Sequence, residues 1–332
     1  MKKTDVSTPK ASGGRKETPA QFGMDEVLWA AWLYYERGLK QDEVADQLGV
    51  SRASIFNLLQ KARDEGVVRI AIDPTRMSRI DLALELAEMT GISEFYILPA
   101  TRQGGSLFDQ LGTLGARVLE QKLTENDTIG VAWGRTIMAL SKALLRASLP
   151  HVTVAQVTGS SAATFDFSPV LCTSNIAERL NARAVNLHAP GVVSSSTVKQ
   201  ILLNEPAIRD HFSLLRQCTK SIFGVTQLEG ETLLVQGGFM TMEEVAVYRK
   251  AGAVGFASGF FFDRHGNIIR SEFDDRHITM AFDDLHKVPA RICVGGGMEK
   301  VEAICAMLKT KMANVIVIDE QTATAVYQKL KE

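Results

Sequence analysis

The chain has 332 residues, in which 37 Lys and Arg nearly balance 38 Asp and Glu and 45% of the residues are hydrophobic. This length favours two or so domains, and this apolar content can bury a large core. A net charge of −1 gives no support for a protein coated in nucleic acid. Any DNA contact must therefore come from local charge.

The sequence predicts neither a membrane partner nor export. The longest uncharged apolar run, Ala251 to Phe262, has 12 residues and is interrupted by glycines, whereas a membrane-spanning helix needs about 20. The N-terminal M-K-K is followed by polar residues rather than by the apolar block of a secretory signal. We therefore expect a cytoplasmic protein.

The cysteines and histidines form no metal-binding or redox pattern. There is no C-x-x-C pair and no nearby pair of histidines. We interpret the cysteines as buried thiols, and we expect no metal site and no cofactor. The cysteines are Cys172, Cys218, Cys293 and Cys305.

Residues 1–23 predict a disordered arm. They are rich in Lys, Thr, Ser, Gly and Pro, and five cations there face two acids. A solvated tail is one interpretation, and a segment that touches DNA phosphates is the other.

Residues 24–73 have the spacing of a helix-turn-helix, the device with which many proteins read DNA. Ala45 is small where two helices must cross closely, and Gly49 supplies the turn between them. The apolar seam consists of Val44, Leu48, Val50, Ile55 and Leu58. Helices are expected over residues 25–37, 41–48 and 51–64, and a short strand, which would form a wing, over 67–72.

The third helix has the charge expected of a DNA-reading helix. Residues 51–63 hold three cations and no acid, whereas residues 25–50 hold six acids against two cations. In the major groove, Arg52 would bind a guanine edge or a phosphate and Asn57 would pair with adenine. Ser51 has a competing role as the helix cap. The predicted DNA-binding residues are Gln41, Ser51, Arg52, Ser54 and Asn57. A helix-turn-helix that binds protein is the alternative, because the second helix is acidic.

The rest of the chain predicts an α/β fold with a parallel sheet covered on both faces. A linker helix is expected within residues 74–92, at 80–89, and a ligand-binding domain over 93–332. Short apolar runs alternate with helical stretches. The expected strands are 95–98, 129–133, 152–157, 184–187, 221–225, 291–294 and 315–318. The expected helices are 107–123, 137–147, 171–180, 301–308 and 322–330.

Three loops after expected strands could hold an anion, because ligands of such sheets sit at the carboxyl ends of strands. G-V-A-W-G-R-T (residues 130–136) allows a ligand to approach the backbone closely and supplies an arginine. The same sequence would also suit a strand-to-helix turn that binds no ligand. T-G-S-S-A-A-T (158–164) offers hydroxyls and a glycine. V-G-G-G-M-E-K (294–300) places Lys300 in a first helical turn, where the helix dipole disfavours a cation unless an anion lies between them. A solvent-facing lysine is the alternative there.

Asp263 has two interpretations. It stands three residues before Gly266, which suits the first position of a β-turn, and its carboxylate could equally bind a sugar hydroxyl.

From about Trp29 to Tyr327, the chain resembles SorC/DeoR-type bacterial transcriptional regulators, in which a helix-turn-helix precedes a Rossmann-like sugar-binding domain related to phosphosugar isomerases and deaminases. The resemblance rests on five motifs in order. They are L-Y-Y-E-R-G-L-K-Q-D-E-V-A-D-Q-L-G-V-S-R (33–52), G-V-A-W-G-R-T (130–136), F-F-D-R-H-G (261–266), G-G-G-M-E-K (295–300) and N-V-I-V-I-D-E-Q-T-A (314–323).

The resemblance implies a regulator that binds double-stranded operator DNA, responds to a phosphorylated sugar or similar metabolite, and forms a homotetramer as a dimer of dimers. The implied effector-binding residues are Trp133, Gly134, Arg135, Thr136, Gly159, Ser160, Ser161, Asp263, Gly296 and Lys300. Two segments depart from the family pattern, V-G-F at 254–256 in place of V-G-D and G-V-T at 224–226 in place of G-I-G. They predict a less polar pocket wall.

A phosphosugar isomerase or deaminase is the alternative function, because Lys300 and Asp263 could act as acid–base groups. The sequence shows no clear pair of general acid and general base, and fold alone does not confer chemistry. We therefore expect a regulator and not an enzyme.

Overall fold

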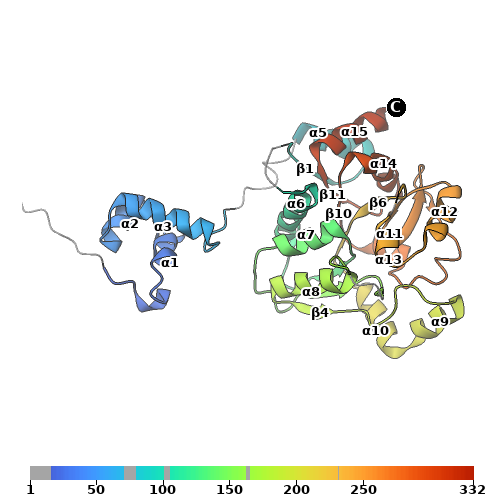
Figure 1. Cartoon of the computed structure of the whole chain (residues 1–332), viewed down its shortest axis with the longest axis horizontal. Coiled ribbons are helices and arrows are strands. Elements are labelled where there is room, and N and C mark those ends of the chain that lie inside the picture. The colour runs from blue at the N-terminus through green and yellow to red at the C-terminus, as the bar shows by residue number, and fades with distance from the viewer. Residues whose placement is uncertain (1–15, 71–79, 101–104, 162–164, 231) are drawn as a thin grey trace, which may run out of the picture. The chain divides into compact units, whose positions relative to one another are not determined.

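The computed structural model describes residues 16–70, 80–100, 105–161, 165–230 and 232–332. The chain divides into two compact units, residues 1–72 and 73–332 (Figure 1). A helical N-terminal unit and an α/β unit with a parallel sheet confirm the predicted fold class. Within the described ranges, none of the helices has the length and apolar character needed to span a membrane.

The N-terminal unit contains the three predicted helices. α1 (Glu26–Ala31) starts after Asp25, whose carboxylate accepts hydrogen bonds from two backbone N–H groups, and it continues as the π-helical turn η2 (Trp32–Glu36). α2 (Gln41–Leu48) has the predicted bounds. α3 (Arg52–Asp64) follows Ser51, which is its N-cap as predicted.

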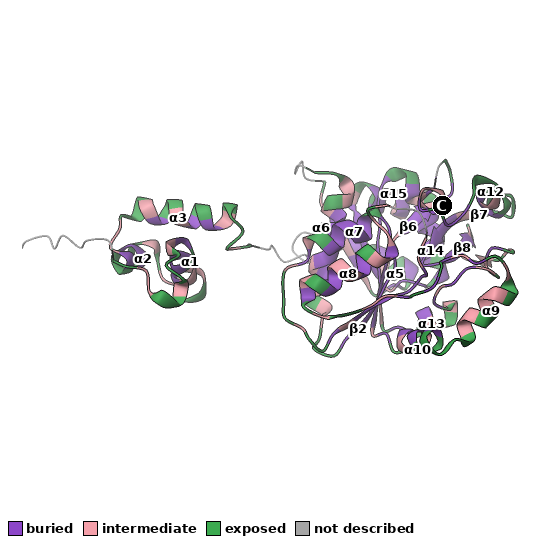
Figure 2. Cartoon of the chain, turned by 60° about the horizontal axis from the view of Figure 1, so that its bottom comes forward, coloured by how far each residue is buried: buried purple, intermediate pink, exposed green. Residues whose placement is uncertain are grey.

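The seam between α2 and α3 is largely the predicted one. Val44, Leu48 and Ile55 are fully buried, and Gly49 has the left-handed φ of +67° that the tight turn requires. Leu59 belongs to the same core, whereas the predicted seam residues Val50 and Leu58 are only partly buried. Burial on one side leaves the opposite face of α3 exposed, as Figure 2 shows.

The two edges of the N-terminal unit differ from the prediction. Within residues 16–23, assigned above to the arm, two residues contact the helices: the Lys16 N–H donates to the Leu48 carbonyl at 2.9 Å, and Phe22, in η1 (Ala20–Phe22), stacks near Trp29. Residues 1–15 lie outside the described residues. The strand predicted over 67–72 does not form at 67–70, where the chain bends instead, and residues 71–72 are not described.

The C-terminal unit is built on a seven-stranded sheet in which every pairing is parallel. All seven predicted strands occur, with bounds shifted by one or two residues. They are β1 (Glu94–Leu98), β2 (Thr128–Val131), β3 (Thr153–Gln156), β4 (Arg183–Val185), β5 (Lys220–Phe223), β10 (Ala290–Val294) and β11 (Val315–Asp319). Their order across the sheet is β1-β11-β10-β5-β2-β3-β4.

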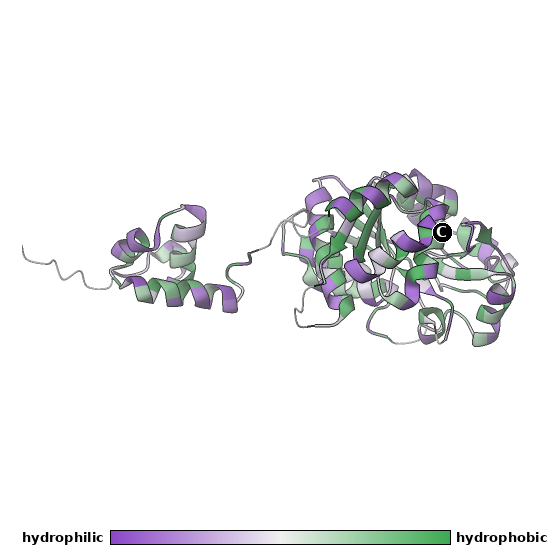
Figure 3. Ribbon diagram, turned by 90° about the horizontal axis from the view of Figure 1, so that it is seen from above, coloured by the Kyte–Doolittle hydropathy of each residue, from purple (hydrophilic) through white to green (hydrophobic). Residues whose placement is uncertain are grey.

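Both faces of this sheet are buried, which explains the continuous apolar runs of its strands. In β11, Val315 and Val317 pack on one face and Ile316 and Ile318 on the other. The first face is covered by α6 (Leu107–Lys122), α7 (Arg135–Ala143) and α8 (Pro169–Leu180). The second is covered by α5 (Ile80–Thr90), α10 (Pro206–Leu215), α13 (Phe282–Lys287), α14 (Val301–Thr310) and α15 (Glu320–Lys331). Figure 3 shows the hydrophobic strands between helices whose outer faces are hydrophilic.

A second, antiparallel sheet of four strands was not predicted. It consists of β6 (Val225–Gln227), β7 (Ala253–Ala257), β8 (Phe260–Asp263) and β9 (Ile268–Ile269). The glycine-interrupted run 251–262 forms its central hairpin, which turns at Ser258-Gly259. The remaining elements are α9 (Ser196–Asn204), α11 (Leu233–Gln236), α12 (Met242–Lys250) and η3 (Met298–Lys300).

The cysteines are buried free thiols, as predicted. Burial raises the pKa of the Cys172, Cys218 and Cys293 thiols to about 12, so these three stay neutral near neutral pH.

Candidate effector site and DNA-reading face

The seven-stranded sheet reverses its strand order between β2 and β5. From β2 the chain moves outward through β3 and β4, and after β5 it moves the other way through β10 and β11. Connections that leave two such strands in opposite directions open a crevice at their carboxyl ends, and ligands of open α/β sheets bind there. The segments that follow β2 and β5 are therefore the first place to look for a site.

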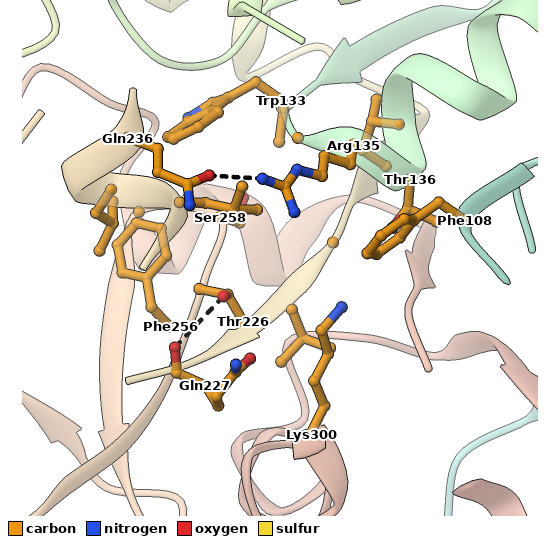
Figure 4. A pocket seen from close by; sticks show the side chains of 18 of the residues that line it. Phe108, Trp133, Arg135, Thr136, Thr226, Gln227, Gln236, Phe256, Ser258 and Lys300 are labelled. Atoms are coloured by element: carbon orange, nitrogen blue, oxygen red, sulfur yellow. Dashed lines mark hydrogen bonds between the residues drawn. The ribbon is translucent and has the colours of Figure 1, made fainter. Parts of the chain in front are cut away.

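A cavity lies at this reversal point, between the carboxyl ends of the parallel strands and the antiparallel sheet (Figure 4). α6, the start of α7, β6, α11, the β7–β8 turn and η3 contribute its walls. The structure brings half of the predicted effector-binding residues together here. They are Trp133, Gly134, Arg135, Thr136 and Lys300.

The predicted Gly159-Ser160-Ser161 loop does not line the cavity. A Cβ at Gly159 would collide with the Pro190 carbonyl, so packing alone requires glycine there. The Ser160 hydroxyl accepts a hydrogen bond from Gln156 Nε2 at 3.1 Å. From this loop, the preceding Thr158 lines the cavity instead, and residues 162–164 lie outside the described residues.

Gly296 also stands outside the cavity lining. A Cβ there would overlap the carboxylate of Asp319. That carboxylate accepts hydrogen bonds from the Gly297 N–H at 3.0 Å and from the Thr322 hydroxyl at 2.7 Å. The glycines of this loop therefore allow a close internal contact that positions η3, which ends with Lys300.

Asp263 belongs to the turn between β8 and β9 and does not line the cavity. Its carboxylate accepts hydrogen bonds from the N–H groups of His265 at 2.8 Å and Asn267 at 2.9 Å. Gly266 has a φ of +86° and donates to the Asp263 carbonyl at 3.0 Å. Of the two interpretations of Asp263, the β-turn describes its geometry.

Two cations flank the cavity beside the ring of Phe108. Lys300 is 7% exposed, and its Nζ lies 5.2 Å from the centre of that ring. The Arg135 guanidinium lies 5.9 Å from it and donates to Gln236 Oε1 at 2.7 Å. Burial is the largest influence on the pKa of Lys300 and lowers it below the usual lysine range, while nearby Glu299 opposes the shift.

The N-terminus of α7 faces the same space without a side-chain cap. Its N-cap is Gly134, at a φ of +130°, and the first intrahelical bond runs from the Met138 N–H to the Gly134 carbonyl at 2.9 Å. The N–H groups of Arg135, Thr136 and Ile137 precede that bond and carry the positive end of the helix dipole. A helix start of this kind binds anions.

Other parts of the cavity lining are aromatic and neutral. Trp133 stacks on Phe239, with ring centres 4.6 Å apart, and Phe256 lines the wall where the family pattern has an acid. Thr226, Gln227 and Ser258 add polar groups that the sequence analysis did not single out as site residues. Among these three residues, the sequence pointed only to Thr226, because G-V-T at 224–226 stands in place of the G-I-G of the family pattern.

Four of the predicted DNA-binding residues belong to α3 or its N-cap, and Gln41 begins α2. Arg52, Asn57 and Ser51 are exposed, and Ser54 and Gln41 are partly buried. Arg52 Nε lies 3.5 Å from Asp42 Oδ1, with both side chains more than two-thirds exposed. Phe56, 56% exposed on the same helix, was missed. An exposed aromatic residue on a recognition helix can contact a thymine methyl group.

Ser51 caps α3, because its Oγ accepts a hydrogen bond from the Ser54 N–H at 3.1 Å. We expect Ser51→Ala to lower the unfolding free energy of the N-terminal unit by about 1 kcal/mol. Ser51→Asp keeps a capping oxygen but adds a negative charge, so stability should hold while DNA affinity falls. Thermal denaturation and DNA titration of both variants measure this. If Ser51→Asp binds DNA with normal affinity, Ser51 does not lie near the DNA phosphates.

Comparison with known proteins agrees with this architecture. Residues 76–328 match the family described as "Putative sugar-binding domain". The uncharacterized transcriptional regulator YjhU of Escherichia coli is 35% identical over 91% of this chain and 94% of its own. The deoxyribonucleoside regulator of Bacillus subtilis is 30% identical over 91% and 96%. The crystal structure of the full-length sorbitol operon regulator SorC from Klebsiella pneumoniae superposes with a TM-score of 0.77 at 21% identity, covering 91% of this chain and 97% of that one.

The fold and the relatives together define a transcriptional regulator with a sugar-binding domain. The chain belongs to this SorC/DeoR-type family, as the resemblance indicated. It is a sugar-responsive DNA-binding regulator and not an enzyme.

Proposed function

We propose that the chain binds double-stranded operator DNA through the exposed face of α3, and that a phosphorylated sugar or polyol bound in the cavity controls this binding. The family resemblance favours a homotetramer arranged as a dimer of dimers. Because the target is DNA, we place the protein in the cytoplasm. The proposed effector contacts are Trp133, Gly134, Arg135, Thr136 and Lys300.

The main support for a phosphorylated effector is the burial of Lys300 without an ion-pair partner in the described part of the chain. Its side chain is buried beside the ring of Phe108 and forms no ion pair with a carboxylate among the described residues, although Glu299 and Asp319 attract it from a distance. A buried charge without a partner is unfavourable. A phosphate in the cavity would supply the missing negative charge, and Arg135 and the free N–H groups of α7 would bind its other oxygens. An uncharged sugar would give neither cation a negatively charged partner.

The remaining lining assigns roles to the rest of such a ligand. Gly134 allows the ligand to approach the backbone closely, and the Thr136 hydroxyl can donate to a phosphate oxygen. The Trp133 ring offers an apolar face to the carbon skeleton. This division, with an anionic group at one end and a carbon chain on an aromatic wall, fits a phosphorylated sugar or polyol.

Regulation then follows from a population shift. The effector stabilises whichever arrangement of subunits binds it better, and that arrangement changes the spacing of paired α3 helices on the operator. Induction, corepression and activation differ only in whether the favoured arrangement is the one that binds DNA.

We expect phosphorylated sugars, but not their unphosphorylated forms, to stabilise the protein. At about 100 times its dissociation constant, a ligand raises the unfolding free energy by about 2.7 kcal/mol. A thermal-shift screen of phosphorylated and unphosphorylated sugars and polyols in matched pairs measures this. Equal stabilisation by both members of every pair would contradict a phosphate site.

The same ligands should bind more weakly at alkaline pH. The pKa of Lys300 in the free protein is lowered by burial, and a bound phosphate would raise it again. Between the second pKa of the phosphate, about 6, and the free-state pKa of Lys300, the lysine is charged with or without ligand, so affinity is flat. Above the free-state pKa, binding requires uptake of a proton, and affinity falls by up to about tenfold per pH unit. Lys300→Arg should remove this dependence, because arginine stays protonated. The same pH dependence in the unmodified protein and in Lys300→Arg would exclude Lys300 from the phosphate.

A further inference from the structure

Two buried polar atoms in the cavity wall have no hydrogen-bond partner within the part of the chain that the structure describes. They are Oε1 of Gln227 and Oγ of Ser258, and both residues line the cavity. Buried polar side-chain atoms are nearly always paired, and an unpaired one costs about 1–3 kcal/mol. Two such atoms on one wall call for a partner that arrives from outside.

Ser258 carries a second unfavourable feature. It precedes Gly259 in the two-residue turn between β7 and β8, with φ of +48° at Ser258 and +98° at Gly259. A turn with positive φ at both positions favours Asn, Asp or Gly at the first, and other residues there are strained. At Gly259, a Cβ would come within 2.8 Å of Thr279, so packing explains the glycine. Among the described residues, no side-chain hydrogen bond explains the serine.

These groups come from a different part of the fold than the two cations. Gln227 ends β6, and Ser258 belongs to the β7–β8 turn, so both come from the antiparallel sheet. Figure 4 shows Gln227 and Phe256 on one side of the cavity, and Phe108 and Thr136 on the other. A ligand whose phosphate lies between Arg135 and Lys300 would therefore extend its far end toward this wall.

The chemistry of the wall selects hydroxyl groups. An amide oxygen accepts a hydrogen bond, and a serine hydroxyl both donates and accepts. A ligand hydroxyl can satisfy either, and it would pair equally well with Gln227 if the amide were turned to present its nitrogen. Phe256, in place of the acid of the family pattern, leaves these neutral groups to identify the ligand. A deoxygenated ligand leaves them unpaired, and sites built to bind a hydroxyl discriminate strongly against such analogues.

We propose that Gln227 and Ser258 form a hydroxyl-reading wall that selects effectors with free hydroxyls at the end remote from the phosphate. This inference rests on the proposed phosphate site. It identifies the effector as a polyhydroxylated sugar phosphate or polyol phosphate rather than a deoxygenated one.

The test compares the affinities of two kinds of probe for the full chain by calorimetry. Inorganic phosphate reports on the cationic end alone. Glycerol 3-phosphate, ribose 5-phosphate, 2-deoxyribose 5-phosphate and glucose 6-phosphate report on both ends. In the unmodified protein, at least one hydroxyl-rich probe should bind more tightly than phosphate. In Ser258→Gly and in Gln227→Leu, the ratio of that affinity to the affinity for phosphate should fall about fivefold.

Ser258→Gly also gives a readout that needs no ligand. Because glycine relieves the positive φ and removes an unpaired hydroxyl, its melting temperature should equal or exceed that of the unmodified protein. Asn181→Gly is the matched control: Asn181 has a φ of +49° at the end of α8 and does not line the cavity. It should leave the affinity ratio as it is.

Each outcome decides the proposal. An unchanged affinity ratio in both variants, or a drop of several degrees in the melting temperature of Ser258→Gly, overturns the hydroxyl-reading wall. The hydroxyl-reading wall is also overturned if the protein binds inorganic phosphate but binds none of the hydroxyl-rich probes more tightly. If neither phosphate nor any probe binds, the proposed phosphate site itself fails, and the inference falls with it.

Discussion

Replacing Lys300 by alanine should abolish the effector response while leaving operator binding intact. The side chain is buried and pairs with no carboxylate among the described residues, so its loss breaks no ion pair and should not unfold the C-terminal unit. A hydrogen bond to a charged group contributes about 1.5–3 kcal/mol, which corresponds to roughly 10–150-fold weaker effector binding. DNA titration with and without effector measures both properties in one experiment.

Lys142→Ala is the matched control for this variant. Lys142 is exposed near the end of α7, the helix whose start faces the cavity, and does not line it. It should respond to the effector like the unmodified protein. A normal effector response of Lys300→Ala would show that the phosphate does not bind at this end of the cavity. Loss of operator binding in the same variant would show instead that Lys300 maintains the fold.

The parallel sheet could be predicted because each of its strands is buried on both faces. Val315 to Ile318 is apolar at every position, since alternate side chains pack against helices on opposite sides. The antiparallel sheet could not be predicted in the same way. β6 and β9 have three and two residues, too few for a periodic pattern. Gly255 interrupts β7, and only Ser258 and Gly259 separate β7 from β8, so the two strands look like one apolar run.

For the site, the sequence could indicate loops but not what their glycines contact. Gly134 faces the cavity, whereas Gly159 and Gly296 are required by Pro190 and Asp319, partners distant along the chain. Local spacing looks the same in the three cases, because a glycine allows close approach of any group, ligand or protein. The polar wall from the antiparallel sheet was missed for a related reason: it faces the cavity only because the sheet folds back over the strand ends.

Replacing Arg52 by alanine should weaken operator binding by about 1–3 kcal/mol, or roughly 5–150-fold, if the residue reads a base. Among the described residues of the free protein, Arg52 pairs with Asp42 alone, at 3.5 Å and in solvent. An exposed pair of this kind contributes about 0–1 kcal/mol, so the fold of the N-terminal unit should be barely affected. DNA must displace this pairing, and Asp42→Asn should therefore retain or raise operator affinity. DNA titrations at several salt concentrations measure these effects.

The salt dependence separates the two contacts that Arg52 can make. A phosphate contact releases counterions, so its loss should reduce the slope of log affinity against log salt by about one and weaken binding to all sequences alike. A base contact instead relaxes the preference at one position of the operator. Lys61→Ala is the comparison, because Lys61 pairs with Glu65 in the last turn of α3, away from the end that enters the groove. If Arg52→Ala binds the operator as tightly as the unmodified protein at every salt concentration tested, α3 does not enter the major groove with Arg52 facing the DNA.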